Sequence, residues 1–259
     1  VDASITIEAD AVNVVGEPHT FTVTVWEDRG LGAGFEPAEG ELVDVTYTSS
    51  GGADAQADDT CTTGSNGTCT VTINSENAGT ITAHAASDVD VDGTTVSVET
   101  DGIAPNSDDA VKTYVDAAIA IGPDHATNAL NHEHIFTVTV WVDDGGGLEP
   151  LEGATPTVSV SPMPDVFDDS DCAGGTDQNG QCIIVINSAF TGTFTANAAV
   201  EVTVDGATVV RSTDGNSGPA GSGPATKTYS EAGIGVEKLV SVDGITWYDA
   251  DDADRAVRT

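Results

Sequence analysis

Basic residues are almost absent from this chain of 259 residues. Seven lysines and arginines stand against 43 aspartates and glutamates, which gives a formal net charge of −36 at pH 7. Because such a surface repels phosphates, the chain is predicted to bind neither nucleic acid nor an anionic membrane surface. An excess of this size favours either a high-salt environment, where screening weakens the self-repulsion, or bound divalent cations that offset it.

Long apolar runs and catalytic motifs are missing as well. No stretch approaches the ~20 apolar residues that a membrane-spanning helix needs, and no basic segment followed by an apolar one opens the chain. We therefore expect no membrane insertion of this segment. No GxSxG, HExxH or phosphate-cradling glycine loop occurs either, so the sequence does not predict an enzyme.

What the chain does contain is an internal repeat. The segment VDASITIEAD at Val1 recurs as VDAAIAIGPD at Val115. The other matching pairs are HTFTVTVWED at His19 with HIFTVTVWVD at His134, NGTCTVTINS at Asn66 with NGQCIIVINS at Asn179, and KTY at Lys112 with KTY at Lys227. The order of these pieces is the same in both copies, which predicts two domains of one kind.

Apolar and polar residues alternate within each copy. Phe21, Val23 and Val25 alternate with threonines, and the second copy repeats the pattern from Phe136 to Val140. This period of two is typical of half-buried strands, and Asn-Gly, Asp-Gly and Gly-Gly pairs separate the strands. About seven short strands in each copy, with no helical periodicity, predict an all-β fold of tandem Greek-key β-sandwiches joined end to end.

The predicted boundaries follow from the repeat. The first sandwich spans 1–114, the second spans 115–232, and 233–259 is either the start of a third β module or a strand-donating tail. The run from Ala110 to Ile121 contains neither glycine nor proline. The last strand of the first sandwich is therefore expected to continue directly into the first strand of the second, which would make the pair a stiff rod. Since Val1 aligns inside such a run, we also expect the chain to be a segment of a longer assembly.

The order of these motifs resembles a known family. A first strand, the FTVTVW strand, a variable loop and then NG.C.V.I.S followed by GT.TA are similar to the bacterial immunoglobulin-like repeats of the invasin and intimin type. The resemblance implies immunoglobulin-like sandwiches that serve as spacers or adhesive rods in large prokaryotic surface proteins. After Ala232 the string GIGVEKLVSVDGITWYDADDAD resembles the opening of a different surface-protein repeat.

The four cysteines fall as one pair in each copy, Cys61 with Cys69 and Cys172 with Cys182. Loops this short favour local disulfides. The alternative is a metal site, but the cysteines lack the close C-x2-C spacing of zinc ligands. Disulfides require an oxidising compartment, so we expect a secreted or cell-surface location.

Aspartates cluster before the first cysteine of each pair. Flexible loops rich in carboxylates are what calcium accepts, although such clusters also arise as solvated surface in an acidic chain. The candidate calcium ligands are Asp54, Asp58 and Asp59 in the first copy and Asp165, Asp168, Asp169 and Asp171 in the second. Calcium is the one cofactor that the sequence suggests. His19 and His134, at equivalent strand starts, are expected to make structural hydrogen bonds rather than to bind a metal.

Trp26 and Trp141 lie on the outward phase of their strands if the alternation holds. An exposed indole could contact a sugar or a partner protein, whereas a bulge at the strand end would fold it over the edge of the sandwich. The leading hypothesis is thus an extracellular structural or adhesive array whose partners are neighbouring repeats or subunits. The alternatives are a module that binds a surface glycan or protein, and an accessory region of a large secreted enzyme.

Overall fold

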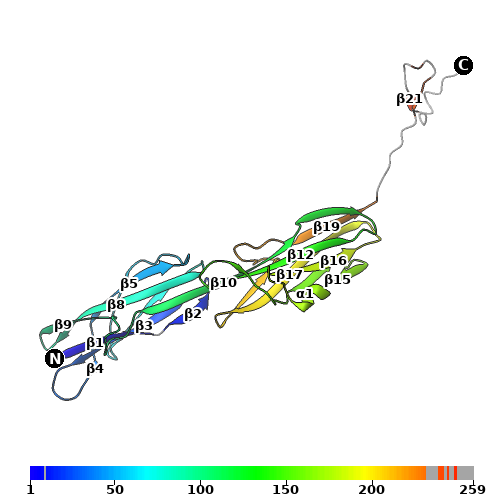
Figure 1. The fold of residues 1–259 in the computed structure, drawn as a ribbon. Coiled ribbons are helices and arrows are strands. Elements are labelled where there is room, and N and C mark those ends of the chain that lie inside the picture. Colours follow the sequence, from blue (N-terminus) through cyan, green and yellow to red (C-terminus); the bar gives the residue numbers. More distant parts are fainter. Residues whose placement is uncertain (9, 232–238, 242–243, 245–247, 250–259) are drawn as a thin grey trace.

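The computed structural model describes residues 1–8, 10–231, 239–241, 244 and 248–249. Within them the chain forms two β-sandwiches that lie end to end (Figure 1). The predicted all-β tandem architecture is confirmed. The one short helix, α1 (Ser170–Gly174), has five residues, and no helix of the described part is long and apolar enough to cross a membrane.

The first sandwich packs two sheets against each other. One sheet contains β1 (Asp2–Ile7), β3 (His19–Asp28), β4 (Glu36–Pro37) and β7 (Thr68–Ile73). The other contains β2 (Ala11–Val14), β5 (Leu42–Ser50), β6 (Asp59–Thr62), β8 (Gly79–Val91), β9 (Thr94–Glu99) and the first part of β10 (Ala110–Gly122).

The second sandwich repeats this plan. One sheet contains the second part of β10 with β12 (His134–Asp143), β13 (Glu149–Pro150), β15 (Val166–Asp168) and β16 (Gln181–Asn187). The other contains β11 (His125–Ala129), β14 (Thr157–Ser161), β17 (Gly192–Val204), β18 (Ala207–Ser212) and β19 (Ala225–Ser230). Beyond these, β20 (Leu239–Val240) pairs with β21 (Tyr248–Asp249), and most of the predicted third unit at 233–259 lies outside the described residues.

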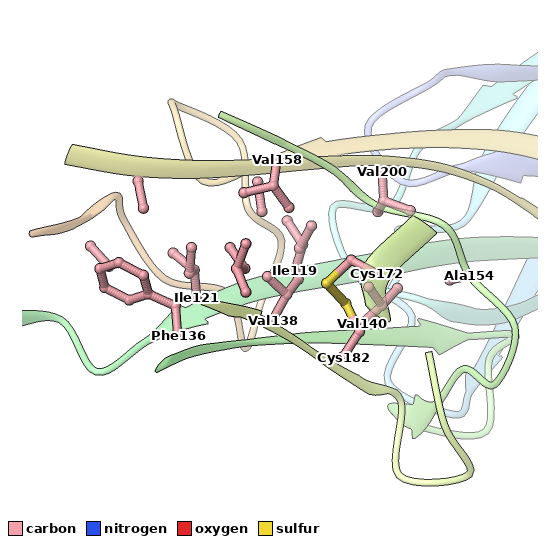
Figure 2. Packing of buried hydrophobic residues seen from close by; sticks show 14 of the residues in the cluster. Ile119, Ile121, Phe136, Val138, Val140, Ala154, Val158, Cys172, Cys182 and Val200 are labelled. Atoms are coloured by element: carbon pink, nitrogen blue, oxygen red, sulfur yellow. A yellow bond between two sulfur atoms is a disulfide. The ribbon is translucent and has the colours of Figure 1, made fainter. Parts of the chain in front are cut away.

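The alternation seen in the sequence builds each core. Phe21, Val23 and Val25 are fully buried between the sheets, while the threonines between them point outward. The second sandwich has the same arrangement, and Figure 2 shows Phe136, Val138 and Val140 pointing into its core beside Ile119 and Ile121. Burying these β-branched and aromatic side chains is the main stabilising term for both sandwiches.

Strand β10 belongs to both sandwiches. Its first part pairs with β8 and β2 over Ala110–Val115, and its second part pairs with β12 over Asp116–Gly122. Tyr114 is buried in the first core and Val115 in the second, so the chain passes from one core to the other within one peptide bond. The predicted continuous strand from Ala110 to Ile121 is confirmed.

Both predicted disulfides, Cys61–Cys69 and Cys172–Cys182, are present, and no described cysteine is free. The bonds do not simply close hairpins around the Asn-Gly turns. Cys61 lies on β6 in one sheet and Cys69 on β7 in the other, so this bond joins the two sheets of the first sandwich. Cys172 lies on α1 and holds that helix against β16, with both sulfurs inside the core (Figure 2).

We predict that replacing Cys172 and Cys182 together by alanine lowers the free energy of unfolding by about 2–4 kcal/mol, because the unfolded chain loses a covalent loop. Urea denaturation of the variant and of the oxidised wild type measures the difference. Wild-type protein reduced under the same conditions is the control. Equal stability of the variant and the oxidised wild type would contradict the prediction.

Candidate functional site

The two tryptophans lie on the outer faces of equivalent strands. Trp26 of β3 stands opposite Ser4 of β1 and Pro37 of β4, and it is half-buried. Trp141 of β12 stands opposite Ala118 and Pro150 and is also half-buried. The residues directly before the tryptophans, Val25 and Val140, are buried in the cores. The alternation of inward and outward residues therefore holds, and both indoles lie on the outward-facing side of their strands.

A shallow groove of about 350 Å³ surrounds Trp26. Its lining comprises Ser4 and Thr6 from β1, Phe35 from the loop after β3, and Pro105 from the loop after β9. Phe35 is 41% exposed, whereas Ser4 is only 3% exposed. Asn106 and Ser107 bring Pro105 to this position, because Asn106 Oδ1 accepts a hydrogen bond from the Ile5 N–H at 3.1 Å and the Ser107 N–H donates to the Ile5 carbonyl at 3.2 Å. Sequence reasoning found the tryptophan but not the groove, since the lining residues are separated by up to a hundred positions.

Two of the candidate calcium ligands have structural roles. A carboxylate oxygen of Asp54 accepts a hydrogen bond from the Glu76 N–H at 2.7 Å, and Asp165 accepts one from the Ala189 N–H at the same distance. Each aspartate thus holds the loop after the Asn-Ser pair of its own repeat. The hydrogen bonds from Glu76 and Asn77 keep the pKa of the Asp54 carboxyl below its usual value.

The other candidates are scattered. Asp59 lies on β6, Asp168 ends β15, and Asp171 accepts a hydrogen bond from the Ile183 N–H at 2.8 Å. Asp58 is exposed and Asp169 precedes α1. Among the described residues no group of three or more His, Cys, Asp or Glu side chains is placed to hold a metal ion. Calcium binding by these residues stays a prediction.

An acidic groove of about 640 Å³, which was not predicted from the sequence, lies on the first sandwich. Its carboxylates are Asp44 on β5, Asp88 on β8, Glu99 on β9 and Asp101 in the following loop. They come together because β5 and β9 pair with the two edges of β8. No described cation lines it, so the groove adds locally to the negative potential of the surface.

The KTY motif places a buried lysine in each sandwich. Lys112 donates to Asn13 Oδ1 at 2.8 Å, while Lys227 Nζ has no hydrogen-bond partner among the described residues. Burial lowers the pKa of Lys112 to about 8 and lowers that of Lys227 as well. The neighbouring Tyr114 and Tyr229 hydroxyls donate to the carbonyls of Ile73 and Ile186, which fixes the end of each sandwich. In the sequence, only the recurrence of KTY in both repeats could have indicated these buried lysine and tyrosine pairs.

The two strand-start histidines differ from expectation. His19 and His134 pack edge-on against Phe21 and Phe136, but the Nε2 atom of each is buried without a partner in the described part of the chain. Burial, together with the charge of Lys227, lowers the pKa of His134 to about 4. The structural hydrogen bond predicted for each histidine is therefore not made by its Nε2 atom.

The strand pairing and the two cores define a protein of tandem immunoglobulin-like β-sandwiches. In solved structures, the chain is similar to the D0-D1 domains of intimin, with 17% identity and a TM-score of 0.28, over 86% of this chain and 97% of that one. The D00-D0 domains of intimin match with 12% identity and a TM-score of 0.39, over 80% of this chain and 96% of that one. Invasin, a bacterial integrin-binding protein, matches with 20% identity and a TM-score of 0.32, over 90% of this chain but only 40% of that one.

The resemblance to invasin and intimin domains expected from the motifs is thus present in the structure comparison. No protein-family model and no curated protein sequence matches the chain. The fold assignment rests on the strand pairing of this chain itself.

We predict a pH-dependent loss of stability that depends on His134. Its pKa in the folded state is about 4, below the ordinary histidine value of 6.5, so between these pH values the unfolded chain binds a proton that the folded chain does not. The free energy of unfolding should therefore fall by about 1–3 kcal/mol as the pH drops from 6.5 to 4, relative to a His134→Gln variant. Denaturation at several pH values measures this difference. His132→Gln, a change at an exposed neighbour, should retain the wild-type pH dependence, and an identical effect of both substitutions would contradict the assignment.

We also predict that salt stabilises the protein, because screening weakens the repulsion among its carboxylates. The melting temperature should rise by several degrees between low and high sodium chloride. Calcium added at constant ionic strength tests the calcium hypothesis separately, with magnesium as its control. An increase specific to calcium that disappears in an Asp58→Asn/Asp59→Asn variant would support binding, and no dependence on either salt or calcium would contradict both expectations.

Proposed function

We propose that this chain is a stiff extracellular segment with a structural or adhesive role on a prokaryotic cell surface. The observation that carries the proposal is the single strand β10, which is an integral part of both sandwiches. Bending the pair at this point would require breaking backbone hydrogen bonds in one or both sheets. The segment is therefore suited to holding what lies at its two ends at a fixed separation.

Side-chain contacts also hold the second half of β10 in place. Arg211 of β18 forms a buried ion pair with Asp116, and its Nε donates to the Ala117 carbonyl at 2.9 Å. Because both charged groups are desolvated and their geometry is fixed, separating them would leave a buried unpaired charge. This pairing fixes β18 to the second half of β10, within the second sandwich.

A close contact between glycines also joins the two sandwiches directly. Gly51 in the first sandwich lies against Gly145 in the second, so closely that a Cβ on Gly51 would be 2.0 Å from the Gly145 carbonyl oxygen. Gly79 lies in the same contact, at 3.2 Å from a Cβ on Gly145. The backbones of the two sandwiches therefore touch directly, with no room for a flexible linker.

The two disulfides support the extracellular role, because they call for an oxidising compartment. We propose the units 1–114, 115–232 and 233–259 as successive modules, with neighbouring repeats or subunits as partners. One solved intimin fragment similar to this chain is in complex with a translocated intimin receptor domain, and a protein receptor is accordingly a candidate partner here.

We predict that a chain ending at Ser230 is elongated in solution. Strands β8 and β17 have 13 residues each. A rise of ~3.3 Å per residue makes each sandwich about 43 Å long and the aligned pair about 85 Å. Small-angle X-ray scattering measures the maximum dimension. A value near that of a side-by-side pair, about 50 Å, would contradict the proposal.

Substitutions at the joint provide a sharper test. Gly51→Ala should lower the free energy of unfolding by about 1–3 kcal/mol more than Gly32→Ala, because only the first introduces a methyl group into the inter-sandwich contact. Both glycines have positive φ, +68° and +87°, but Gly32 has nothing within 4 Å of its added Cβ. Equal losses would show that the contact does not constrain the joint.

A further inference from the structure

We propose that the groove around Trp26 binds a neutral saccharide. The site lies on the outer face of the first sandwich, between β1, β3 and two loops. It is independent of the stiffness of the rod, so a failure of either proposal leaves the other intact. Four features support the proposal: the groove floor, its walls, the surrounding charge and the residues that differ in the second repeat.

The floor offers hydrogen-bonding groups without partners. Ser4 is 3% exposed and Thr6 is half-buried. Neither hydroxyl has a hydrogen bond to any described residue, although Ser4 lies directly beneath the groove opposite Trp26. Neither oxygen is among the fully buried polar atoms, so both are accessible from the groove and can donate to or accept from a ligand bound there.

The walls are apolar rings. The Trp26 indole, the exposed Phe35 ring and the exposed Pro105 ring border the same space. The apolar C–H faces of a pyranose pack well on such rings, while its hydroxyl groups point to the sides. A purely apolar peptide would fit the walls but would leave the Ser4 and Thr6 hydroxyls unsatisfied, which favours the sugar.

Charge selects a neutral ligand. Arg29, three residues after Trp26, is already paired with Glu27 at 2.7 Å, and the chain as a whole carries a net charge of −36. An acidic sugar would be repelled without gaining a free cationic partner. An uncharged saccharide has no such disadvantage.

The second repeat lacks both hydroxyls and the second aromatic ring at the equivalent positions. Ala118 and Ala120 stand where the first repeat has Ser4 and Thr6, and Leu148 follows β12 where Phe35 follows β3. Trp141 keeps its place opposite Ala118. The tryptophan is therefore common to both sandwiches, while the hydroxyls and the second aromatic ring belong to the first alone. This difference provides a matched control within one chain.

The test uses the full chain and a panel of neutral hexasaccharides built from glucose, galactose, mannose, xylose or N-acetylglucosamine. Saturation-transfer NMR identifies those that bind, and titration monitored by amide shifts locates and quantifies binding. For a binding member, we expect Ser4→Ala/Thr6→Ala to weaken affinity about five- to tenfold through the lost hydrogen bonds. Phe35→Ala, in an exposed loop, should also weaken binding. Leu148→Ala should leave it unchanged, and thermal melts confirm that each variant is folded.

Shift changes at Ser4, Thr6 and Trp26 that weaken in both first-repeat variants would support the site. The proposal would be overturned if no member of the panel bound, or if binding were undiminished in the Ser4→Ala/Thr6→Ala and Phe35→Ala variants. An equal loss of affinity in Leu148→Ala would also overturn it. So would preferential binding of a decaproline peptide or an oligogalacturonate at the same groove. The peptide result would identify a protein-binding groove, and the oligogalacturonate result would contradict the selection of neutral ligands.

Discussion

The shared strand β10 is the constraint on which the remaining structure depends. Up to Val115 its backbone pairs with β8 and β2, and beyond Val115 it pairs with β12. The register of this one strand therefore sets the orientation of the second sandwich relative to the first. The Asp116–Arg211 ion pair lies beside the point where β10 changes sandwich, and the Gly51–Gly145 contact joins the two sandwiches directly. The proposed stiffness would therefore rest first on backbone pairing and second on these contacts.

On this fixed framework the two repeats diverge at their surfaces. The segment before Cys61 forms β6 and pairs with β5, whereas the segment before Cys172 forms β15 and pairs with β16 in the opposite sheet. The equivalent side chains of the two segments also make different contacts. Phe167 packs against the second core, while Gln56 at the same position of the first repeat donates to the Asn74 carbonyl at 2.7 Å.

This comparison also shows what the sequence could and could not predict. Alternation around Phe21, the recurrence of KTY and the absence of glycine or proline near Val115 predicted the strands, the repeat and the continuous junction, because each depends on local patterns. The pairing of β15 brings Phe167 against the distant residues of the second core, and the groove at Trp26 depends on Pro105 meeting β1 across a hundred residues. Long-range contacts of this kind carry no signature in a single sequence. The unpaired Nε2 of His134 was missed for the same reason.

The distribution of charge connects the fold to its surroundings. Of the cations in the described residues, Lys112 and Lys227 are fully buried and Arg211 is buried in its ion pair, which leaves Arg29 alone at the surface. The exterior is thus more uniformly negative than the net charge of the sequence indicates. A compact arrangement would crowd these carboxylates, whereas an end-to-end pair separates many of them by more than the ~8 Å over which charges interact at physiological salt. The same uniform negative charge also opposes side-by-side association of copies of this chain.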